Sequence, residues 1–121
     1  MARILVMDDD AEIRSIIAAV LGAAGHEIAQ AGDGDAGLKL YNPGRIDLVI
    51  TDIEMPKKDG FDVIMALRGN HARTPVIAIS GGAAPTDPYL EMARLLGVAG
   101  TLEKPFRATQ LLEAVAQALA P

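Results

Sequence analysis

Short apolar runs alternate with segments of helical periodicity along the whole chain. The apolar runs are bounded by polar, Gly or Pro residues and are predicted to be strands; they lie at residues 3–7, 26–31, 46–51, 75–80 and 100–103. Between these runs, apolar residues recur every three or four positions, as on the buried face of a helix. The spacing predicts helices at residues 13–24, 35–41, 63–67, 87–96 and 111–119.

A strict alternation of strand and helix is typical of an α/β fold with a parallel sheet covered on both faces. Right-handed crossovers leave few possible topologies for such a chain. The run at 26–31 has one strong β-former, Ile28, and is therefore placed at an edge of the sheet. We predict a five-stranded parallel sheet in the order 2-1-3-4-5, flanked by five helices, which is the doubly wound flavodoxin-like class.

Composition narrows the possible functions. The chain has 121 residues, half of them hydrophobic, and we expect one domain over 1–121 without an output domain. Its net charge of -5 argues against direct contact with nucleic acid or an anionic membrane. The absence of Cys excludes disulfides, thiolate zinc sites and a Cys nucleophile. No apolar run is long enough to span a bilayer, and we expect the protein to be located in the cytoplasm.

Polar residues follow four of the predicted strands. Asp8 and Asp9 end the first strand, Asp52 the third, Ser80 the fourth and Lys104 the fifth. In open α/β sheets, ligands bind outside the carboxyl ends of the strands. Because strands 1, 3, 4 and 5 are neighbours in the predicted order, these side chains are expected to meet in one crevice.

This set of groups suits phosphoryl transfer. Three carboxylates in one crevice repel one another, and a hard divalent cation removes the conflict. Mg²⁺ is the expected ion, with Mn²⁺ also possible. A carboxylate such as Asp52 can attack phosphorus and form an aspartyl-phosphate. The metal and Lys104 would supply positive charge for the moving phosphoryl group, and Ser80 a neutral donor.

Several motifs together resemble a known family. They are the ILVMDD run at residues 4–9, the DIEMPKKDG run at 52–60, the strand ending in Ser80, and Lys104-Pro105-Phe106. In this order and at these intervals, the chain resembles a response-regulator receiver domain of the CheY-like family over essentially its full length. The resemblance implies a cis peptide bond before Pro105.

The resemblance also implies roles around a metal ion. Asp52 resembles the phosphoacceptor, Asp9 the direct metal ligand, and Asp8 the acidic partner that binds metal mainly through water. The main-chain carbonyl of Glu54 is expected to complete the protein ligands. The Glu54 side chain, two residues after the acceptor, is expected to affect the lifetime of the phosphorylated state.

The remaining roles concern switching and partners. Ser80 resembles the hydroxyl that turns toward the phosphoryl group, and Lys104 the lysine that pairs with it. The family takes phosphoryl from a phosphohistidine on a sensor kinase or phosphotransfer protein. It then shifts the surface of its fourth helix, fifth strand and fifth helix toward a protein target. On this view the chain is no enzyme, because its only chemistry is on itself.

One position departs from the family pattern. The family usually has Tyr, Phe or His where this chain has Thr101, so no ring is available to rotate inward after phosphorylation. We hypothesise that the loop at 81–87, with its Gly pair and its proline, carries the conformational switch instead.

Simpler interpretations and rival functions remain open. Asp8 or Asp9 alone would be interpreted as a helix cap, and Asp10 is assigned that role. His26 and His71 are expected at the surface. One rival is a degenerate receiver that signals by binding alone. The other is a Mg²⁺-dependent phosphohydrolase of the haloacid-dehalogenase type, in which the nucleophile would end the first strand.

Overall fold

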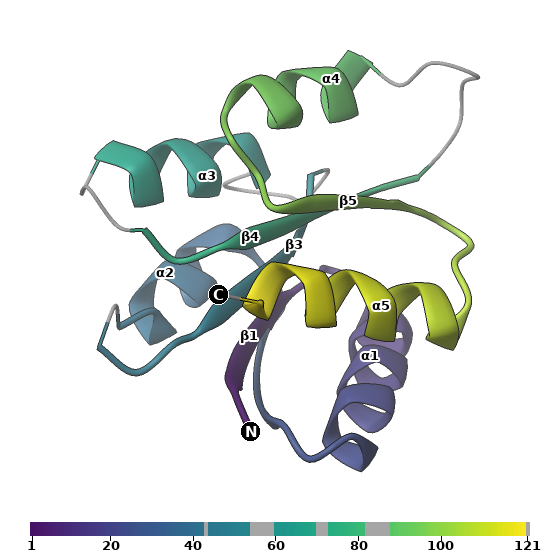
Figure 1. The fold of residues 1–121 in the computed structure, drawn as a ribbon. Coiled ribbons are helices and arrows are strands. Elements are labelled where there is room, and N and C mark those ends of the chain that lie inside the picture. The colour runs from purple at the N-terminus through teal and green to yellow at the C-terminus, as the bar shows by residue number, and fades with distance from the viewer. Residues whose placement is uncertain (43, 54–59, 70–72, 82–87, 121) are drawn as a thin grey trace.

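The computed structural model describes residues 1–42, 44–53, 60–69, 73–81 and 88–120. Strands and helices alternate five times along the chain, as the apolar pattern predicts (Figure 1). The strands are β1 Arg3–Met7, β2 Glu27–Ala31, β3 Leu48–Asp52, β4 Val76–Ser80 and β5 Gly100–Glu103. The helices are α1 Ala11–Ala23, α2 Gly34–Leu40, α3 Gly60–Gly69, α4 Pro88–Leu95 and α5 Ala108–Leu119.

The sheet has the predicted topology. Its order is β2-β1-β3-β4-β5, and all four strand pairs are parallel. All five residues of β3 and all five of β4 are buried, as expected of central strands. In β2 only one residue is fully buried, as expected of a strand at the edge of the sheet. The predicted fold class and strand order are therefore confirmed.

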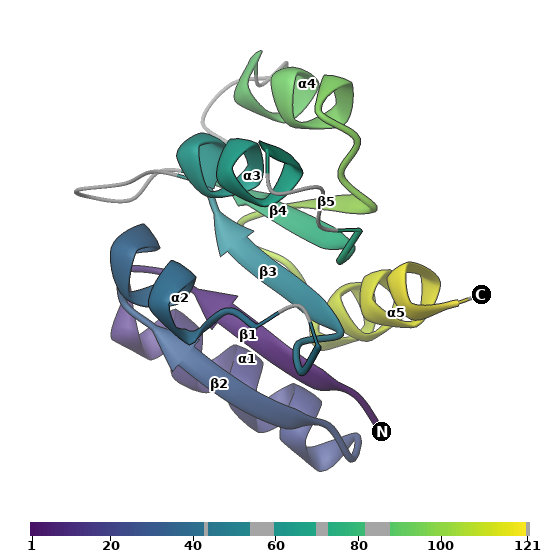
Figure 2. The same ribbon diagram turned by 90° about the vertical axis from the view of Figure 1, so that its left-hand side faces the viewer.

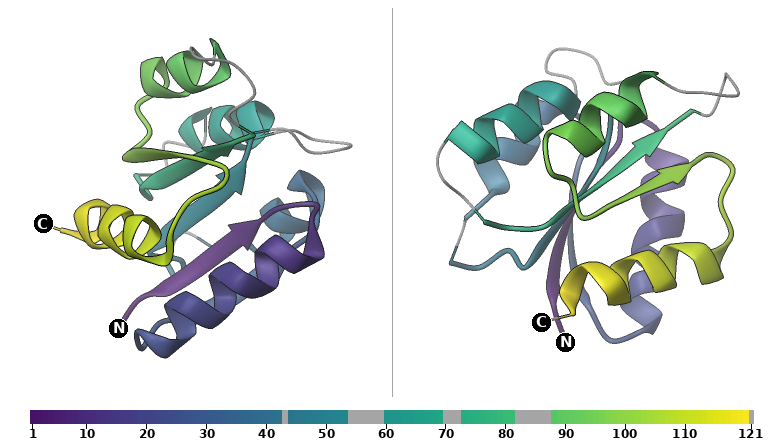
Figure 3. Two further views of the ribbon diagram at one scale, coloured as in Figure 1. Left: turned by 90° about the vertical axis from the view of Figure 1, so that its right-hand side faces the viewer. Right: turned by 45° about the horizontal axis from the view of Figure 1, so that its top comes forward.

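Helices cover both faces of the sheet. Figures 1 and 2 show α2, α3 and α4 on one face and α1 and α5 on the other. Successive strand residues point to opposite faces, so Leu5 packs in the core beneath α2 to α4, and Ile4 packs in the core beneath α1 and α5. The views in Figure 3 show the twist of the sheet between these two layers. Within the described residues, every helix is too short or too polar to span a bilayer.

The helix ends follow from local chemistry. Asp10 is the N-cap of α1, and its side chain accepts hydrogen bonds from the amides of Glu12 and Ile13, as predicted. Gly25 has a φ of 96°, a left-handed conformation that favours glycine and ends the helical segment before β2. The predicted cap at Asp87 lies outside the described residues.

Three strands begin later than predicted, the fourth strand by one residue, at Val76 rather than Pro75. The second begins at Glu27 rather than residue 26, because the main-chain amide of His26 still donates to the Leu21 carbonyl at the end of α1, at 3.1 Å, and Glu27 is the first residue to pair with β1. The ring of His26 accepts a hydrogen bond at Nδ1 from the Ala2 amide at 3.1 Å. His26 is half-buried, so the expectation of a surface residue is wrong in part. The third begins at Leu48, although Ile46 is already buried. His71 lies outside the described residues.

Candidate functional site

Three carboxylates meet where β1 and β3 end. One oxygen each from Asp8, Asp9 and Asp52 lies within 4.8 Å of the others. Asp8 is fully buried and Asp52 nearly so, whereas Asp9 is exposed. The two strands are adjacent in the sheet, with Met7 in register with Thr51, so their following residues emerge side by side.

A lysine from the end of β5 reaches the same place. The Nζ atom of Lys104 donates to Asp52 Oδ2 at 2.8 Å and lies 3.0 Å from Asp8 Oδ2. Its main-chain amide donates to the Ser80 carbonyl at 2.8 Å, which fixes the start of the loop after β5 to the end of β4. The peptide bond between Lys104 and Pro105 is cis, as the family resemblance implies.

The Asp8 residue is held by several groups. Its amide donates to the Ala31 carbonyl at 3.2 Å, and its Oδ1 accepts from the Asp10 amide at 2.9 Å. Its own carbonyl accepts from Nη1 of Arg14 at 2.6 Å. The buried Oδ2 atom forms an ion pair with the Nζ atom of Lys104, 3.0 Å away.

Burial and charge shift two ionisation equilibria here. Burial raises the pKa of the Asp8 carboxyl above its ordinary value, and the charge of Asp52 adds to this effect, against the lowering effects of the Asp10 amide and of Lys104. Burial lowers the pKa of the Lys104 ammonium, but the hydrogen bonds and charges of Asp52 and Asp8 outweigh this, so that its pKa is raised. Lys104 is therefore a permanent cation at neutral pH.

The donor set fits a hard divalent cation. All three candidate ligands are carboxylates, and oxygen ligands are what Mg²⁺ prefers. Among the described residues, the buried Asp8 Oδ2 has no partner beyond its ion pair with Lys104, which leaves it able to accept a metal cation as well. The exposure of Asp9 leaves one side of the cluster open to water and to phosphate oxygens. The fourth predicted ligand, the Glu54 carbonyl, lies outside the described residues.

Ser80 and Thr101 lie on the neighbouring strands. Ser80 is buried at the end of β4, one residue beyond Ile79, which is the register partner of Asp52. Thr101 is half-buried in β5, and its Oγ1 accepts from Nη2 of Arg94 in α4 at 3.4 Å. Ser80 therefore lies near Asp52. Thr101 is farther from this end of the sheet, two residues before Glu103, the register partner of Ser80, and its side chain faces α4.

Two features beside the carboxylates were not singled out by the sequence pattern. One is Arg14. It lies three residues before the buried Ile17, and therefore at the edge of the face of α1 that packs against the sheet. The other is an apolar groove of about 410 Å³ that reaches from α1 to Lys104. The groove is lined by Ile13, Ile16, Ile17, Gly81, Lys104, Pro105 and Phe106. Its sequence signal is Ile16, an isoleucine on the outer side of α1 that is 53% exposed.

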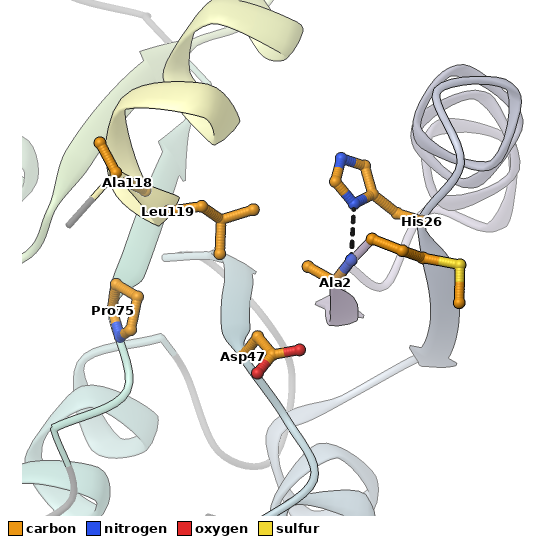
Figure 4. Close-up of a pocket in the computed structure, with 8 residues that line it drawn as sticks. Ala2, His26, Asp47, Pro75, Ala118 and Leu119 are labelled. Atoms are coloured by element: carbon orange, nitrogen blue, oxygen red, sulfur yellow. Dashed lines mark hydrogen bonds between the residues drawn. The ribbon is translucent and has the colours of Figure 1, made fainter.

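The opposite end of the sheet holds a different hollow. This pocket of about 560 Å³ lies between the starts of β1, β3 and β4 and the end of α5 (Figure 4). Its titratable side chains are His26 and Asp47, and Figure 4 shows them pointing from separate segments, with the His26 ring turned toward Ala2. It lacks the converging carboxylates of the first site and is not assigned a reaction.

Comparisons with known proteins agree with this geometry. Residues 4–116 match the model of the response regulator receiver domain. The chain is 38% identical over 112 residues to the transcriptional regulatory protein CpxR of Escherichia coli, covering 93% of this chain and 47% of CpxR. It thus spans about half the length of the curated relatives it matches.

Solved structures give the same result. A response regulator receiver domain protein from Clostridium thermocellum superposes with a TM-score of 0.90 at 31% identity, covering 98% of this chain and 94% of that one. The chemotaxis protein CheY4 of Vibrio cholerae superposes with a TM-score of 0.87 at 30% identity, covering 98% and 99%. With the matched residues, the fold and the carboxylate cluster in agreement, the chain belongs to the family of response regulator receiver domains of two-component systems.

Proposed function

We propose that the chain accepts a phosphoryl group on Asp52 and that this reaction switches its contacts with a partner protein. The observation that carries the proposal is the meeting of Asp52 with Asp8, Asp9 and Lys104 at one edge of the sheet. Four charged groups from the ends of three strands converge there, and two of the four are buried.

The reaction follows from the positions of these groups. An oxygen of Asp52 attacks the phosphorus of a phosphohistidine, the P–O bond forms and the P–N bond breaks. The electron pair returns to the imidazole, which leaves as the neutral ring after taking up a proton. Lys104 already lies 2.8 Å from Asp52 Oδ2, so its ammonium is placed to pair with an oxygen of the new phosphoryl group. Ser80, at the end of the adjacent strand, is assigned as the neutral donor.

A bound Mg²⁺ would neutralise the carboxylates and attract the oxygens of the incoming phosphoryl group. Receiver domains generally bind this ion, and Asp8, Asp9 and Asp52 are the side chains that would hold it here. The carbonyl of Glu54 is kept as a proposed fourth ligand, and Mn²⁺ as a possible substitute ion.

The phosphodonor is proposed to bind over the groove beside Lys104. Receiver domains interact with sensor kinases or phosphotransfer proteins, and such a donor must bring its histidine to Asp52. The groove is apolar, opens next to the acceptor, and exposes Ile16 to solvent. It is therefore suited to an apolar stripe on a helix of the donor.

The surface formed by α4, β5 and α5 is proposed to change on phosphorylation and to contact the protein target. Without an aromatic residue at position 101, the contact between Arg94 and Thr101 joins α4 to β5 instead. The loop hypothesis for 81–87 is retained, although all of it but Gly81 lies outside the described residues. Residues 1–121 are proposed to act as one receiver domain in the cytoplasm, on a protein target rather than directly on nucleic acid.

The two rival functions differ in what they require. A haloacid-dehalogenase-type hydrolase would place its nucleophile at the end of β1. Here the carboxylate at the end of β1, Asp8, is fully buried and its Oδ1 accepts a hydrogen bond from the Asp10 amide, whereas Asp52 at the end of β3 retains some exposure. A degenerate receiver would not need the complete set of carboxylates and Lys104.

A phosphorylation assay separates these functions. The protein is incubated with Mg²⁺ and acetyl phosphate, and intact mass and hydroxylamine-sensitive phosphate are measured. We expect one phosphoryl group per chain on the native protein and none on Asp52→Asn. An unmodified native protein would indicate the degenerate receiver, and sustained turnover of p-nitrophenyl phosphate that survives Asp52→Asn would indicate a hydrolase.

A further inference from the structure

The side chain of Arg14 binds the main chain at the corner between β1 and α1. Its Nη1 donates to the carbonyl of Asp8 at 2.6 Å. Met7 is the last residue of β1 that pairs with β2 and β3. The carbonyl of Asp8 is therefore the first carbonyl after the paired part of the strand. A carbonyl in this position needs a partner when it is removed from water, and the guanidinium supplies one.

The position of Arg14 differs from that of an ordinary surface arginine. Its Nε is buried and has no hydrogen-bond partner within the described part of the chain. Burying a guanidinium N–H without a partner is unfavourable, and a solvated arginine would avoid it. Gly32 adjoins the guanidinium: a Cβ there would lie 3.4 Å from Nη1 of Arg14, in van der Waals contact with it.

The contact acts on the direction of the next carboxylate. The carbonyl of Asp8 belongs to the peptide plane that joins Asp8 to Asp9, and this plane sets the orientation from which the Asp9 side chain departs. The same residue, Asp8, presents Oδ1 to the Asp10 amide at 2.9 Å, and its carboxylate belongs to the cluster with Asp9 and Asp52. A fixed plane therefore orients both aspartates at once.

We infer that Arg14 is a positioning residue that holds the Asp8 carbonyl and so aims the carboxylates of Asp8 and Asp9 at a divalent cation. The inference rests on the proposed function, because it assigns Arg14 to the proposed metal site. Arg14 does not touch the metal ligand atoms of Asp8 in this role; it acts through the main chain.

The test is a calorimetric titration of the full chain with Mg²⁺. Arg14→Met keeps the length of the side chain and removes its donors, and we expect the Kd for Mg²⁺ to rise about tenfold, as for other groups that orient metal ligands. Arg14→Lys keeps a donor and the charge, and its Kd for Mg²⁺ is expected to lie between those of the native protein and of Arg14→Met. Arg45→Met, the same change at an exposed arginine, is expected to leave the Kd unchanged.

A second variant displaces the guanidinium without removing it. Gly32→Val branches from a Cβ that would already lie 3.4 Å from Nη1 of Arg14, and this added bulk is expected to weaken Mg²⁺ binding in the same direction. A readout without metal accompanies both: hydrogen exchange of the Asp10 amide, which bonds to Asp8, is expected to be faster in Arg14→Met. Should Arg14→Met fail to fold, Arg14→Lys and Gly32→Val carry the same test.

The outcomes are distinct. Loss of a cation alone would tighten Mg²⁺ binding to the carboxylates, so an unchanged or lower Kd in Arg14→Met overturns the positioning role. If that happens while the native protein still binds Mg²⁺ and is phosphorylated on Asp52, the proposed function stands and only this inference fails. If the native protein binds no Mg²⁺, both the positioning role of Arg14 and the metal site in the proposed function are overturned.

Discussion

Lys104 and Asp52 are 52 residues apart in the chain, yet the Nζ atom of the lysine donates to the Oδ2 atom of the aspartate at 2.8 Å. The same Nζ is 3.0 Å from Asp8 Oδ2. One cation thus lies between two carboxylates that would otherwise repel each other. This relationship depends on the ends of three strands lying at one edge of the sheet, and it leads to the first prediction.

Replacing Lys104 by Met should lower both stability and phosphorylation. The change leaves Asp8 and Asp52 close together without their cation. Breaking a buried ion pair by removing one partner costs about 3–5 kcal/mol, and because Lys104 is 21% exposed we expect about 2 kcal/mol. Urea unfolding without metal measures the loss. Lys39→Met, at an exposed lysine of α2, is the control and should change unfolding by less than about 0.5 kcal/mol.

The pH dependence of the metal-free protein should report the Asp8 carboxyl. Its pKa is raised by burial, so between the unfolded value of about 3.9 and the higher folded value the native state holds a proton that the unfolded state has lost. Stability from this group is therefore present at low pH and is lost as pH rises through the folded pKa. The Lys104 pKa is also raised, and its contribution is lost only in strongly alkaline solution.

Asp8→Asn tests this assignment. Asn can still accept from the Asp10 amide but carries no charge, so the metal-free variant should unfold a few degrees higher than native protein at neutral pH. Thermal melts in the presence of a chelator, recorded from acid to neutral pH, give the comparison. The difference between the two proteins should shrink as the pH is lowered. A variant less stable than native protein at neutral pH would contradict the prediction, because it would show that Lys104 and the Asp10 amide outweigh the cost of burying the Asp8 charge.

Gly60 is predicted to be required for the position of the acceptor. A Cβ at residue 60 would lie 2.5 Å from the Asp52 carbonyl oxygen and 2.6 Å from Ile53 Cα. Both are main-chain atoms, so the strand end itself must move. Gly60→Ala should destabilise the protein by about 1–3 kcal/mol and slow phosphorylation by acetyl phosphate.

Gly22→Ala is the matched control for that substitution. Gly22 lies in α1, and a methyl group added there would have no neighbour within 4 Å, so Ala should stabilise the helix by about 0.5–1 kcal/mol. Equal phosphorylation rates in Gly60→Ala and native protein would remove Gly60 from any role in positioning Asp52.

Ile16→Glu is predicted to separate the donor surface from the chemistry. Ile16 is 53% exposed and lines the groove beside Lys104. A charge there should slow phosphoryl transfer from a phosphorylated histidine phosphotransfer protein about tenfold, since an apolar contact becomes a desolvated carboxylate. Phosphorylation by acetyl phosphate should stay within about twofold of native protein, because the small donor does not need the groove.

An exposed apolar residue on the other face serves as the control. Leu40→Glu, in α2, changes a side chain that is 50% exposed and lies outside this groove, and it should leave both reactions unaltered. If Ile16→Glu and Leu40→Glu slow the protein donor equally, the effect comes from net charge rather than from the groove.

The sequence predicts the fold because its signals are local and repeated. Each strand is an apolar run followed by polar residues, and the weak β2 run identifies its own edge position. The convergence of Asp8, Asp9, Asp52 and Lys104 then follows from strand order alone. These groups lie where the sheet puts its strand ends, so no side-chain detail is needed to bring them together.

Other features depend on side-chain directions that no pattern reports. The reach of Arg14 to the Asp8 carbonyl depends on the rotamer of its side chain. The ring of His26 turns to the Ala2 amide, which neither its spacing nor its polarity indicates. The apolar groove forms only when α1 and the segment after β5 are placed side by side.

The strand that carries Asp52 belongs to both layers of the molecule. Val49 packs beneath α2, α3 and α4, whereas Leu48 and Ile50 pack beneath α1 and α5. A densely packed interior transmits a displacement rather than absorbing it. If the proposed phosphorylation of Asp52 takes place, the new negative charge at the end of β3 would therefore act on a strand whose packing connects it to the helices on both faces of the sheet.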